Sequence, residues 1–195
     1  MNENYEEKLK KEVNKAAEVI MRGGTILYPT DTVWGIGCDA TRQKPVKKVF
    51  NIKLRDESKS LIILVDSIER VKMHTSFYSD FIYDLVKGFD KPTTIIYPGA
   101  KNLAKNVIAK DGTVAIRVVG HEFCKRLIST LDRPIVSTSA NIAGEDTPSV
   151  YSEITRNIRQ QVDHIVEWEQ NVLMEVKPST ILRIKENGMY DVIRP

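Results

Sequence analysis

Apolar residues recur along this chain at two spacings, one typical of helices and the other typical of buried strands. Near the N-terminus they follow a helical spacing, which predicts an amphipathic helix that ends at Gly23-Gly24. The apolar face of this helix consists of Leu9, Val13, Ala16, Ala17 and Ile20. The short run Thr25–Tyr28 follows and is predicted as a strand that ends at Pro29.

The same pattern continues toward the C-terminus and predicts an alternation of helices and strands. Further helices are expected at Pro45–Leu54, Phe77–Phe89 (with Phe81, Leu85 and Phe89 on its apolar face), His121–Leu131 and Tyr151–Val162. Further strands are expected at Leu61–Val65, Thr93–Tyr97, Val114–Val118, Pro134–Ser137, Ile181–Ile184 and Tyr190–Ile193, the last two pairing across Glu186-Asn187-Gly188. This order predicts an α/β (α+β) fold with a mixed sheet and flanking helices, in a single domain over residues 1–195.

Composition supports a single domain and argues against several classes of protein. The 195 residues are 42% hydrophobic, enough for a core, whereas the longest apolar runs have only about five residues. The N-terminus is polar and acidic, unlike a signal peptide. Cys38 and Cys124 do not suggest a disulfide framework, and the three histidines lack the spacing of metal ligands. We therefore expect a reduced, cytoplasmic protein with no membrane partner and no metal-ligand set.

Positive charge is concentrated in one segment. The residues from Arg42 to Ser60 include seven Lys or Arg against two acids, in a chain whose net charge is +3. Lys53, Arg55 and Lys59 lead directly into the predicted buried strand, whose rigid entrance would hold them in place to bind an anion. A solvated, lysine-rich helix face explains the same composition, and the charge pattern alone leaves both interpretations open.

Standard nucleotide and nucleophile motifs do not account for this cluster. The chain has no Gly-x-x-x-x-Gly-Lys-Ser/Thr phosphate loop. Gly35-Ile-Gly37-Cys-Asp-Ala40 fits the dinucleotide fingerprint, but it does not open a helix directly after the first strand, as that fingerprint requires. No Gly-x-Ser-x-Gly elbow or aligned Cys/His pair indicates a covalent intermediate.

Three segments rich in small polar residues lie at the ends of predicted strands. They are Pro29–Gly37, Ser137–Asn141 and Pro178–Thr180. Ligands of open α/β sheets bind at such positions. Clusters of Ser, Thr, Asn and Gly also form plain turns, so each segment alone is weak evidence of a site.

Five motifs in order are similar to those of YrdC-like proteins. They are Pro29-Thr-Asp-Thr-Val-Trp-Gly-Ile-Gly37, Lys53-x-Arg55-x-x-x-Lys59-x-Leu61, Thr113-Val-Ala-Ile-Arg117, Ser137-Thr-Ser-Ala-Asn141 and Pro178-Ser-Thr180. The chain resembles the short, single-domain threonylcarbamoyl-AMP synthases of that family, from about residue 10 to Arg194. The resemblance implies a twisted sheet with a basic concave face. It also implies a reaction in which L-threonine, bicarbonate and ATP give threonylcarbamoyl-adenylate and pyrophosphate.

The resemblance further implies partners and site residues. ATP would enter with Mg²⁺, and other proteins would transfer the threonylcarbamoyl group to a tRNA adenosine next to the anticodon. Lys53 and Arg55 are the implied catalytic residues. The implied threonine ligands are Thr32, Arg117, Ser139 and Ser179, and the implied ATP ligands are Lys53, Arg55, Lys59, Thr113, Asn141 and Arg194.

Three positions depart from the family pattern. Ser60 replaces a common proline, which predicts a looser turn, and Leu64 replaces a histidine near the threonine, which removes one contact. Lys91-Pro92-Thr93 replaces the commoner Gly-Pro-x-Thr.

Two other functions fit the same features. A non-catalytic module that binds tRNA or double-stranded RNA would use the basic cluster, although Trp34 and Phe50 are the only aromatic residues nearby that could stack on bases. The isoelectric point of about 8.7 is also modest for such a module. A relative that forms a carbamoyl-adenylate would keep the sheet and ATP and use another carbamoyl donor.

Overall fold

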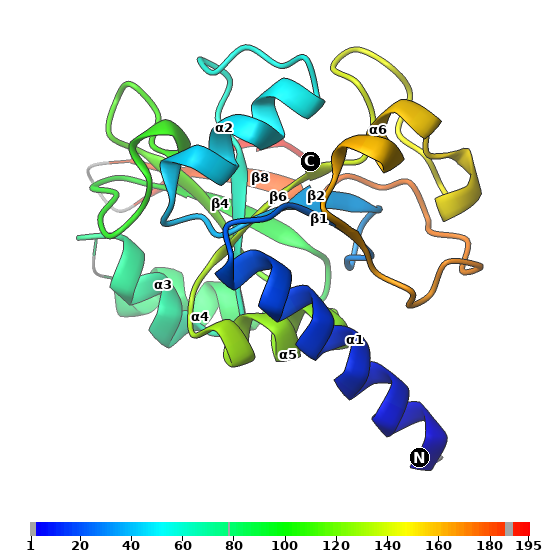
Figure 1. Cartoon of the computed structure of the whole chain (residues 1–195). Coiled ribbons are helices and arrows are strands. Elements are labelled where there is room, and N and C mark those ends of the chain that lie inside the picture. Colours follow the sequence, from blue (N-terminus) through cyan, green and yellow to red (C-terminus); the bar gives the residue numbers. More distant parts are fainter. Residues whose placement is uncertain (1–2, 78, 186–188) are drawn as a thin grey trace.

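A twisted mixed sheet forms the centre of the protein (Figure 1). The structure, a computed structural model, describes residues 3–77, 79–185 and 189–195. The strands are Ile26–Tyr28 (β1), Gly35–Gly37 (β2), Ile62–Val65 (β3), Thr93–Tyr97 (β4), Val114–Val118 (β5), Ile135–Ser139 (β6), His164–Ile165 (β7), Thr180–Ile184 (β8) and Tyr190–Arg194 (β9). Within the described residues they lie side by side in the order β7-β1-β2-β6-β3-β5-β4-β8-β9.

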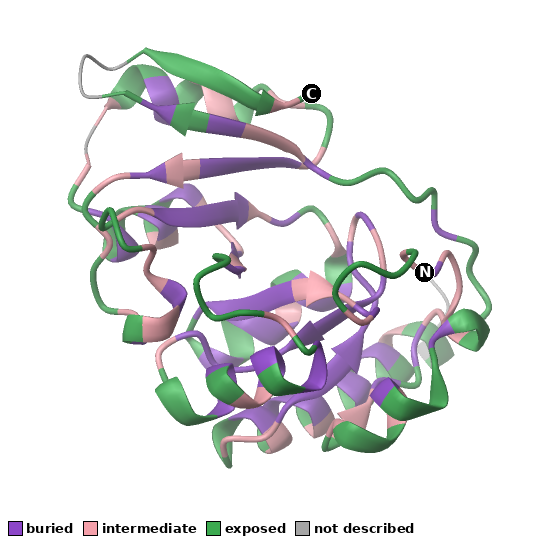
Figure 2. Cartoon of the chain, turned by 90° about the horizontal axis from the view of Figure 1, so that it is seen from above, coloured by how far each residue is buried: buried purple, intermediate pink, exposed green. Residues whose placement is uncertain are grey.

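The sheet combines both strand directions, as the sequence predicts. The pairs β1–β7, β3–β5 and β4–β8 are parallel, whereas the remaining neighbours are antiparallel. The hairpin of β8 and β9 is confirmed, and its predicted turn at residues 186–188 lies outside the described residues. Strand β9 forms an exposed edge of the sheet, close to the C-terminus (Figure 2).

Helices cover both faces of the sheet. They are Glu3–Met21 (α1), Gln43–Ile52 (α2), Ile68–His74 (α3), Asp80–Lys87 (α4), Glu122–Leu131 (α5) and Arg156–Gln161 (α6). Figure 1 shows α1 and α5 below the sheet, and α2 and α6 above it. The predicted apolar face of α1 is buried with α5 in one hydrophobic cluster, and α2 contributes to a second. Burial of these two clusters against the sheet stabilises the mixed α/β arrangement.

Two predicted helices are shorter than the hydrophobic pattern indicates. Helix α4 begins after Ser79, whose hydroxyl accepts a hydrogen bond from the backbone N–H of Ile82 at 3.3 Å. Ile82 and Tyr83 of this helix are buried while Phe81 is 68% exposed, contrary to the prediction, whereas Leu85 and Phe89 pack against the core as predicted. The predicted helix Tyr151–Val162 is instead a short 3₁₀ turn followed by α6, because the backbone is extended at Ile154 and not helical at Thr155.

Three short elements have no clear signal in the sequence. Strands β2 and β7 have only three and two residues, and α3 has seven. Periodicity cannot be read from so few positions, and neighbouring strands stabilise β2 and β7 from outside the segment. Among the described residues, no helix combines the length and the apolar character that crossing a membrane requires.

Candidate active site

A cavity of about 380 Å³ lies between the β1–β2 loop and the ends of several strands. Three arginines line it, Arg55, Arg117 and Arg194, and no lining residue that the structure describes carries a carboxylate. Seven hydroxyl side chains also line it, namely those of Thr32, Ser60, Ser137, Thr138, Ser139, Thr147 and Ser179. Fixed guanidinium groups with hydroxyl donors and no opposing acid suit a ligand that carries several negative charges.

Sheet pairing brings these side chains together from distant parts of the chain. Arg117 on β5 is in register with Thr94 on β4 and with Leu64 on β3. Thr94 is in turn paired with Ile181 on β8, and Ile181 with Arg194 on β9. Residues in register on adjacent strands share a face of the sheet, so this pairing places Arg117, Ile181 and Arg194, from three strands, around one cavity.

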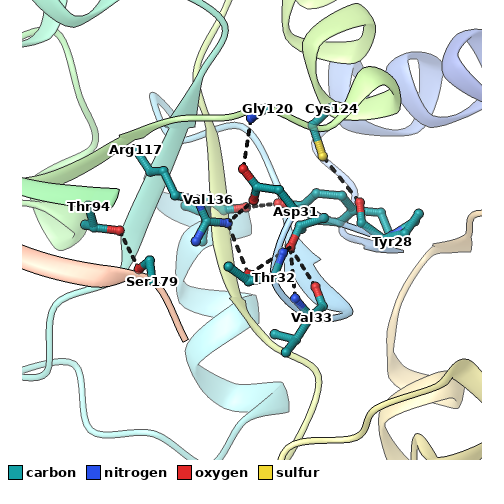
Figure 3. Close-up of polar contacts among 12 residues, drawn as sticks. Tyr28, Asp31, Thr32, Val33, Thr94, Arg117, Gly120, Cys124, Val136 and Ser179 are labelled. Atoms are coloured by element: carbon teal, nitrogen blue, oxygen red, sulfur yellow. Dashed lines mark hydrogen bonds and ion pairs between the residues drawn. The ribbon is translucent and has the colours of Figure 1, made fainter. Parts of the chain in front are cut away.

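Arg117 is held by two residues of the β1–β2 loop (Figure 3). Its side chain is only 4% exposed, and its Nη2 atom lies 2.9 Å from Asp31 Oδ1. The same nitrogen donates to Thr32 Oγ1 at 3.4 Å, while Asp31 Oδ2 accepts the backbone N–H of Gly120 at 2.9 Å. The buried Nε of Arg117 has no hydrogen-bond partner among the described residues. A buried guanidinium with an unused donor is suited to bind a carboxylate.

The β1–β2 loop folds around the hydroxyl of Thr30. This hydroxyl donates to the carbonyl oxygen of Val33 at 2.7 Å and accepts the backbone N–H groups of Thr32 and Val33 at 3.2 and 3.3 Å. It also lies 3.1 Å from Thr32 Oγ1. Cys124 Sγ donates to the carbonyl oxygen of Pro29 at 3.3 Å, which ties the loop to α5. These local bonds hold Thr32 at the cavity wall.

Ser179 and Arg194 form the opposite wall. Arg194 donates through Nε and Nη2 to the carbonyl oxygen of Ser179, at 2.9 and 2.7 Å. The Ser179 hydroxyl is hydrogen-bonded to Thr94 Oγ1 at 2.8 Å (Figure 3). Burial, together with the charge of Arg117, lowers the pKa of Arg194. Two cations near each other in a partly dehydrated cavity strengthen the attraction of that cavity for an anionic ligand.

Arg55 follows the end of α2. Its Nη2 donates to the carbonyl oxygen of Ser60 at 3.1 Å, within the turn where the sequence departs from its relatives. The helix ends at Ile52, the following Leu54 has a left-handed φ of 49°, and the Arg55 backbone N–H donates to the carbonyl oxygen of Phe50 at 3.0 Å. This termination turns the chain sharply and directs Arg55 to the cavity.

Lys53 points in another direction. Its side chain is buried, and Nζ donates to the carbonyl oxygens of Ser139 and Asn141 at 2.5 and 2.6 Å and to Asn141 Oδ1 at 3.3 Å. Three acceptors match the three N–H donors of an ammonium group. Burial, and to a lesser extent Arg55, lowers the pKa of Lys53 to about 8. In this structure Lys53 therefore holds the loop after β6.

The structure brings six of the implied site residues into the cavity lining: Thr32, Arg55, Arg117, Ser139, Ser179 and Arg194. The other four, Lys53, Lys59, Thr113 and Asn141, do not line it. Lys59 is exposed, and Thr113 donates through Oγ1 to Asp111 Oδ1 at 2.7 Å. Asn141 is buried and donates to the carbonyl oxygens of Ile142 and Glu145.

Several residues at the site had no assigned role in the sequence interpretation. Ser137 and Thr138 lie within a quoted motif but were not singled out, and Thr147 lies outside every motif. Asp31 is part of the first motif. Its carboxylate stands between two threonines there, and this was the feature of the sequence that could have identified it as a site residue. Two of the positions that depart from the family pattern lie in different places. Ser60 lines the cavity, whereas Leu64 is fully buried in the core.

A second cavity of about 580 Å³ adjoins the first, and Thr32 and Pro178 line both. Lys91 and Pro92, from the third departure, line this second cavity. His121 Nε2 lies 2.8 Å from Glu169 Oε2 at its wall. Among the described residues, no group of three or more His, Cys, Asp or Glu side chains could hold a metal ion.

A mixed α/β sheet with an arginine-lined, hydroxyl-rich cavity defines a class of proteins that bind small anionic ligands. Comparison with known proteins identifies the family within this class. The Sua5_yciO_yrdC family model, described as "Telomere recombination", matches residues 18–195. The chain belongs to the Sua5/YciO/YrdC family.

Curated relatives share most of their length with this chain. A threonylcarbamoyl-AMP synthase of Pseudoalteromonas translucida is 31% identical over 85% of this chain and 89% of its own length. A protein of the same name from Stutzerimonas stutzeri is also 31% identical, over 94% of this chain and 96% of its own length.

Solved structures agree with this assignment. Sua5 from P. abyssi, as an H234A/Y235A variant, superposes with a TM-score of 0.83 at 28% identity over 94% of this chain. P. abyssi Sua5 complexed with L-threonine gives a TM-score of 0.81 at 27% identity over 89% of this chain. This chain spans 56% and 51% of those two longer chains.

Proposed function

We propose that this protein is a threonylcarbamoyl-AMP synthase, which converts L-threonine, bicarbonate and ATP into threonylcarbamoyl-adenylate and pyrophosphate. The observation that carries the proposal is the cavity with three arginines, seven hydroxyls and no carboxylate among its described lining residues. The names of the relatives from P. translucida and S. stutzeri support the reaction, and the L-threonine complex of P. abyssi Sua5 supports the amino-acid substrate.

The reaction brings two anions together. Threonine and bicarbonate first form a carbamate with loss of water, and a carbamate oxygen then attacks the α-phosphorus of ATP and displaces pyrophosphate. Fixed cations lower the barrier by positioning the reactants and by neutralising the charge that they share in the transition state. Such a reaction needs no nucleophilic side chain.

The cavity suggests an orientation for the substrates. Arg117 would bind the threonine carboxylate, because it is buried beside Thr32 and retains a donor with no partner among the described residues. Ser139 and Ser179 would donate hydrogen bonds to the same substrate. Arg55 would contact the phosphates at the other wall.

The nucleotide would extend along β5 from this point. Ile62 on β3 is in register with Ala115 on β5, and Thr113 directly precedes β5, at the end opposite to Arg117. Four residues of a strand span about 13 Å, a length that a nucleotide can cover. In this arrangement Lys59 and Thr113 would contact the nucleotide outside the cavity, and Arg194 would contact it from β9.

Lys53 and Asn141 would act on the loop after β6. Because Lys53 Nζ bonds to Ser139 and Asn141, it would set the position of the Ser139 hydroxyl in the cavity. Mg²⁺ would neutralise part of the triphosphate charge. With no carboxylate among the described lining residues, the ion would be held by phosphate oxygens and water.

The product of this reaction is an activated mixed anhydride, which a transferase must consume. We propose that its threonylcarbamoyl group passes to a tRNA adenosine next to the anticodon, in the cytoplasm. Direct affinity for tRNA would be a side property of the basic surface around α2.

The reaction is tested by following pyrophosphate release from ATP, Mg²⁺, bicarbonate and labelled threonine. We expect release that requires all three substrates, with labelled threonine recovered in an adenylate. Release with carbamoyl phosphate in place of threonine and bicarbonate would favour the carbamoyl-adenylate alternative. Binding of tRNA without any turnover would favour the RNA-binding module.

Arg55→Ala tests the phosphate contact. A charge-assisted hydrogen bond contributes about 1.5–3 kcal/mol, so kcat/KM should fall roughly tenfold to a few hundredfold. Arg55→Lys should recover only part of this loss, since an ammonium group cannot form the bidentate contact. Lys47→Ala is the matched control, because Lys47 lies exposed on α2 and outside the cavity lining. Equal losses in Arg55→Ala and Lys47→Ala would contradict a specific role for Arg55.

A further inference from the structure

Asp31 joins the β1–β2 loop to the end of β5 through both of its carboxylate oxygens. Oδ1 lies 2.9 Å from Arg117 Nη2, and Oδ2 accepts the backbone N–H of Gly120 at 2.9 Å (Figure 3). The side chain is 14% exposed, and that of its arginine partner is 4% exposed. Within the part of the chain that the structure describes, Asp31 is the only acid in ion-pair distance of Arg117.

The pair uses one nitrogen of the guanidinium and leaves others for a ligand. Nη2 contacts Asp31 and Thr32, whereas Nε has no hydrogen-bond partner among the described residues. An arginine side chain has several rotatable bonds, and ordering them on ligand binding costs free energy. A fixed acid on one nitrogen removes that cost while the remaining N–H donors stay available.

The position of the Asp31–Arg117 pair also distinguishes it from an ordinary buried ion pair. Arg117 lines the first cavity, Asp31 lines the second, and Thr32 lines both. The pair therefore lies in the wall between the two cavities, at the place where the proposed function puts the threonine carboxylate.

We propose that Asp31 is a positioning residue for the amino-acid substrate, which orients Arg117 so that its free donors receive the substrate carboxylate. The proposal rests on the proposed function. It assigns to Asp31 no contact with the substrate, so its effect must pass through Arg117. It also predicts that Asp31 affects the binding of threonine and leaves ATP binding unchanged.

Asp31→Asn tests the proposal because asparagine keeps the size of the side chain and can still accept the Gly120 N–H. We expect KM for L-threonine to rise by about tenfold to a hundredfold, since a misplacement of about 1 Å can cost that much. We expect kcat at saturating threonine and KM for ATP to stay within about threefold of wild type. The reason is that the weakened contact between Arg117 and the threonine carboxylate contributes equally to the ground state and the transition state. The preference for L-threonine over L-threoninamide, which lacks the carboxylate, should fall by a similar factor.

Asp132→Asn is the matched control. Asp132 is 87% exposed and pairs with Arg70 at 3.1 Å, so this variant has the same change of charge at a surface ion pair. It should keep the wild-type KM for threonine. If Asp31→Asn fails to fold, Asp31→Asn/Arg117→Met continues the test because it removes both charges of the pair. It is compared with Arg117→Met, in which Asp31 still accepts the Gly120 N–H.

Each possible result either supports or overturns the proposal. Equal discrimination between threonine and threoninamide in Arg117→Met and in the double variant would support action through Arg117. A further loss in the double variant would show direct contact by Asp31 and overturn the proposal. Wild-type KM and discrimination in Asp31→Asn would overturn it as well. No threonine-dependent pyrophosphate release by the wild-type protein would overturn the proposed function, and this inference with it, before any variant is compared.

Discussion

Lys53 illustrates, at the scale of single residues, how burial changes the role of a charged side chain. The sequence placed it beside Arg55 in a basic motif, and both were interpreted as phosphate ligands. In the structure the two side chains diverge, because Lys53 is the last position before the left-handed turn at Leu54. Lys53 bonds to the loop after β6, whereas Arg55 reaches the cavity.

Lys53→Met should change how stability depends on pH. The pKa of Lys53 is about 8 in the folded protein and 10.5 in its ordinary state, so the unfolded chain binds more protons between these values. The free energy of unfolding contributed by this group therefore rises as the pH increases from about 8 toward 10.5, by up to about 3 kcal/mol. Below pH 8 both states are protonated and the contribution is constant.

Urea unfolding at pH 7 and at pH 9.5 measures this effect. The wild-type protein should gain stability over this interval relative to Lys53→Met, which lacks the titrating group. Lys47→Met is the control, because Lys47 is exposed and should show the wild-type pH dependence. Parallel pH dependences of wild type and Lys53→Met would show that Lys53 titrates normally.

At the scale of elements, β2 depends on glycine. A Cβ atom at Gly37 would lie 2.5 Å from the carbonyl oxygen of Val136 and 2.6 Å from Cε1 of Tyr28. The sequence analysis predicted that Pro29–Gly37 follows a strand as a segment of small polar residues, whereas the structure places Gly35–Gly37 in a strand between β1 and β6.

Gly37→Ala should therefore destabilise the protein. The Val136 carbonyl belongs to the sheet and cannot move freely, so overpacking should lower the free energy of unfolding by about 1–3 kcal/mol. Activity should fall with it, because β6 carries Ser137 and Ser139 to the cavity. Gly88→Ala is the control, since its Cβ would come no closer than 3.5 Å to any other atom. Urea unfolding of both variants should separate them, and equal stabilities would contradict the packing argument.

At the scale of the whole molecule, ligand binding should stabilise the fold. The cavity is formed by residues from β2, β3, β4, β5, β6, β8 and β9, so a bound ligand links segments that separate on unfolding. At 100 times its Kd, ATP with Mg²⁺ should add about 2.7 kcal/mol to the free energy of unfolding. For a chain of this size that corresponds to a rise in Tm of roughly 5–10 °C.

Thermal unfolding with ATP, with threonine and with tRNA measures this linkage. We expect ATP with Mg²⁺ to raise Tm in the absence of RNA. An unchanged Tm at saturating ATP, with a rise on adding tRNA, would favour the RNA-binding module over the enzyme. Arg55→Ala should show a smaller rise with ATP at the same concentration.

Sequence alone was sufficient for features that depend on neighbours along the chain. The apolar face of α1, the strands β4 and β5 and the β8–β9 hairpin follow from local periodicity, and the motif residues Thr32, Arg55, Arg117, Ser139 and Ser179 all line the cavity. The short motifs could be recognised because their chemistry resides in the residue types themselves.

Tertiary structure decided what depends on contacts between distant segments. Strand β7 exists because β1 pairs with it, and the face with which α4 packs on the core carries Ile82 and Tyr83 and leaves Phe81 exposed. The direction of Lys53 and the pairing of Asp31 with Arg117 were likewise set by packing, since these partners lie far apart in sequence. Hydrophobic periodicity reports which residues are buried, but the partner of each buried charge is chosen only when the strands assemble.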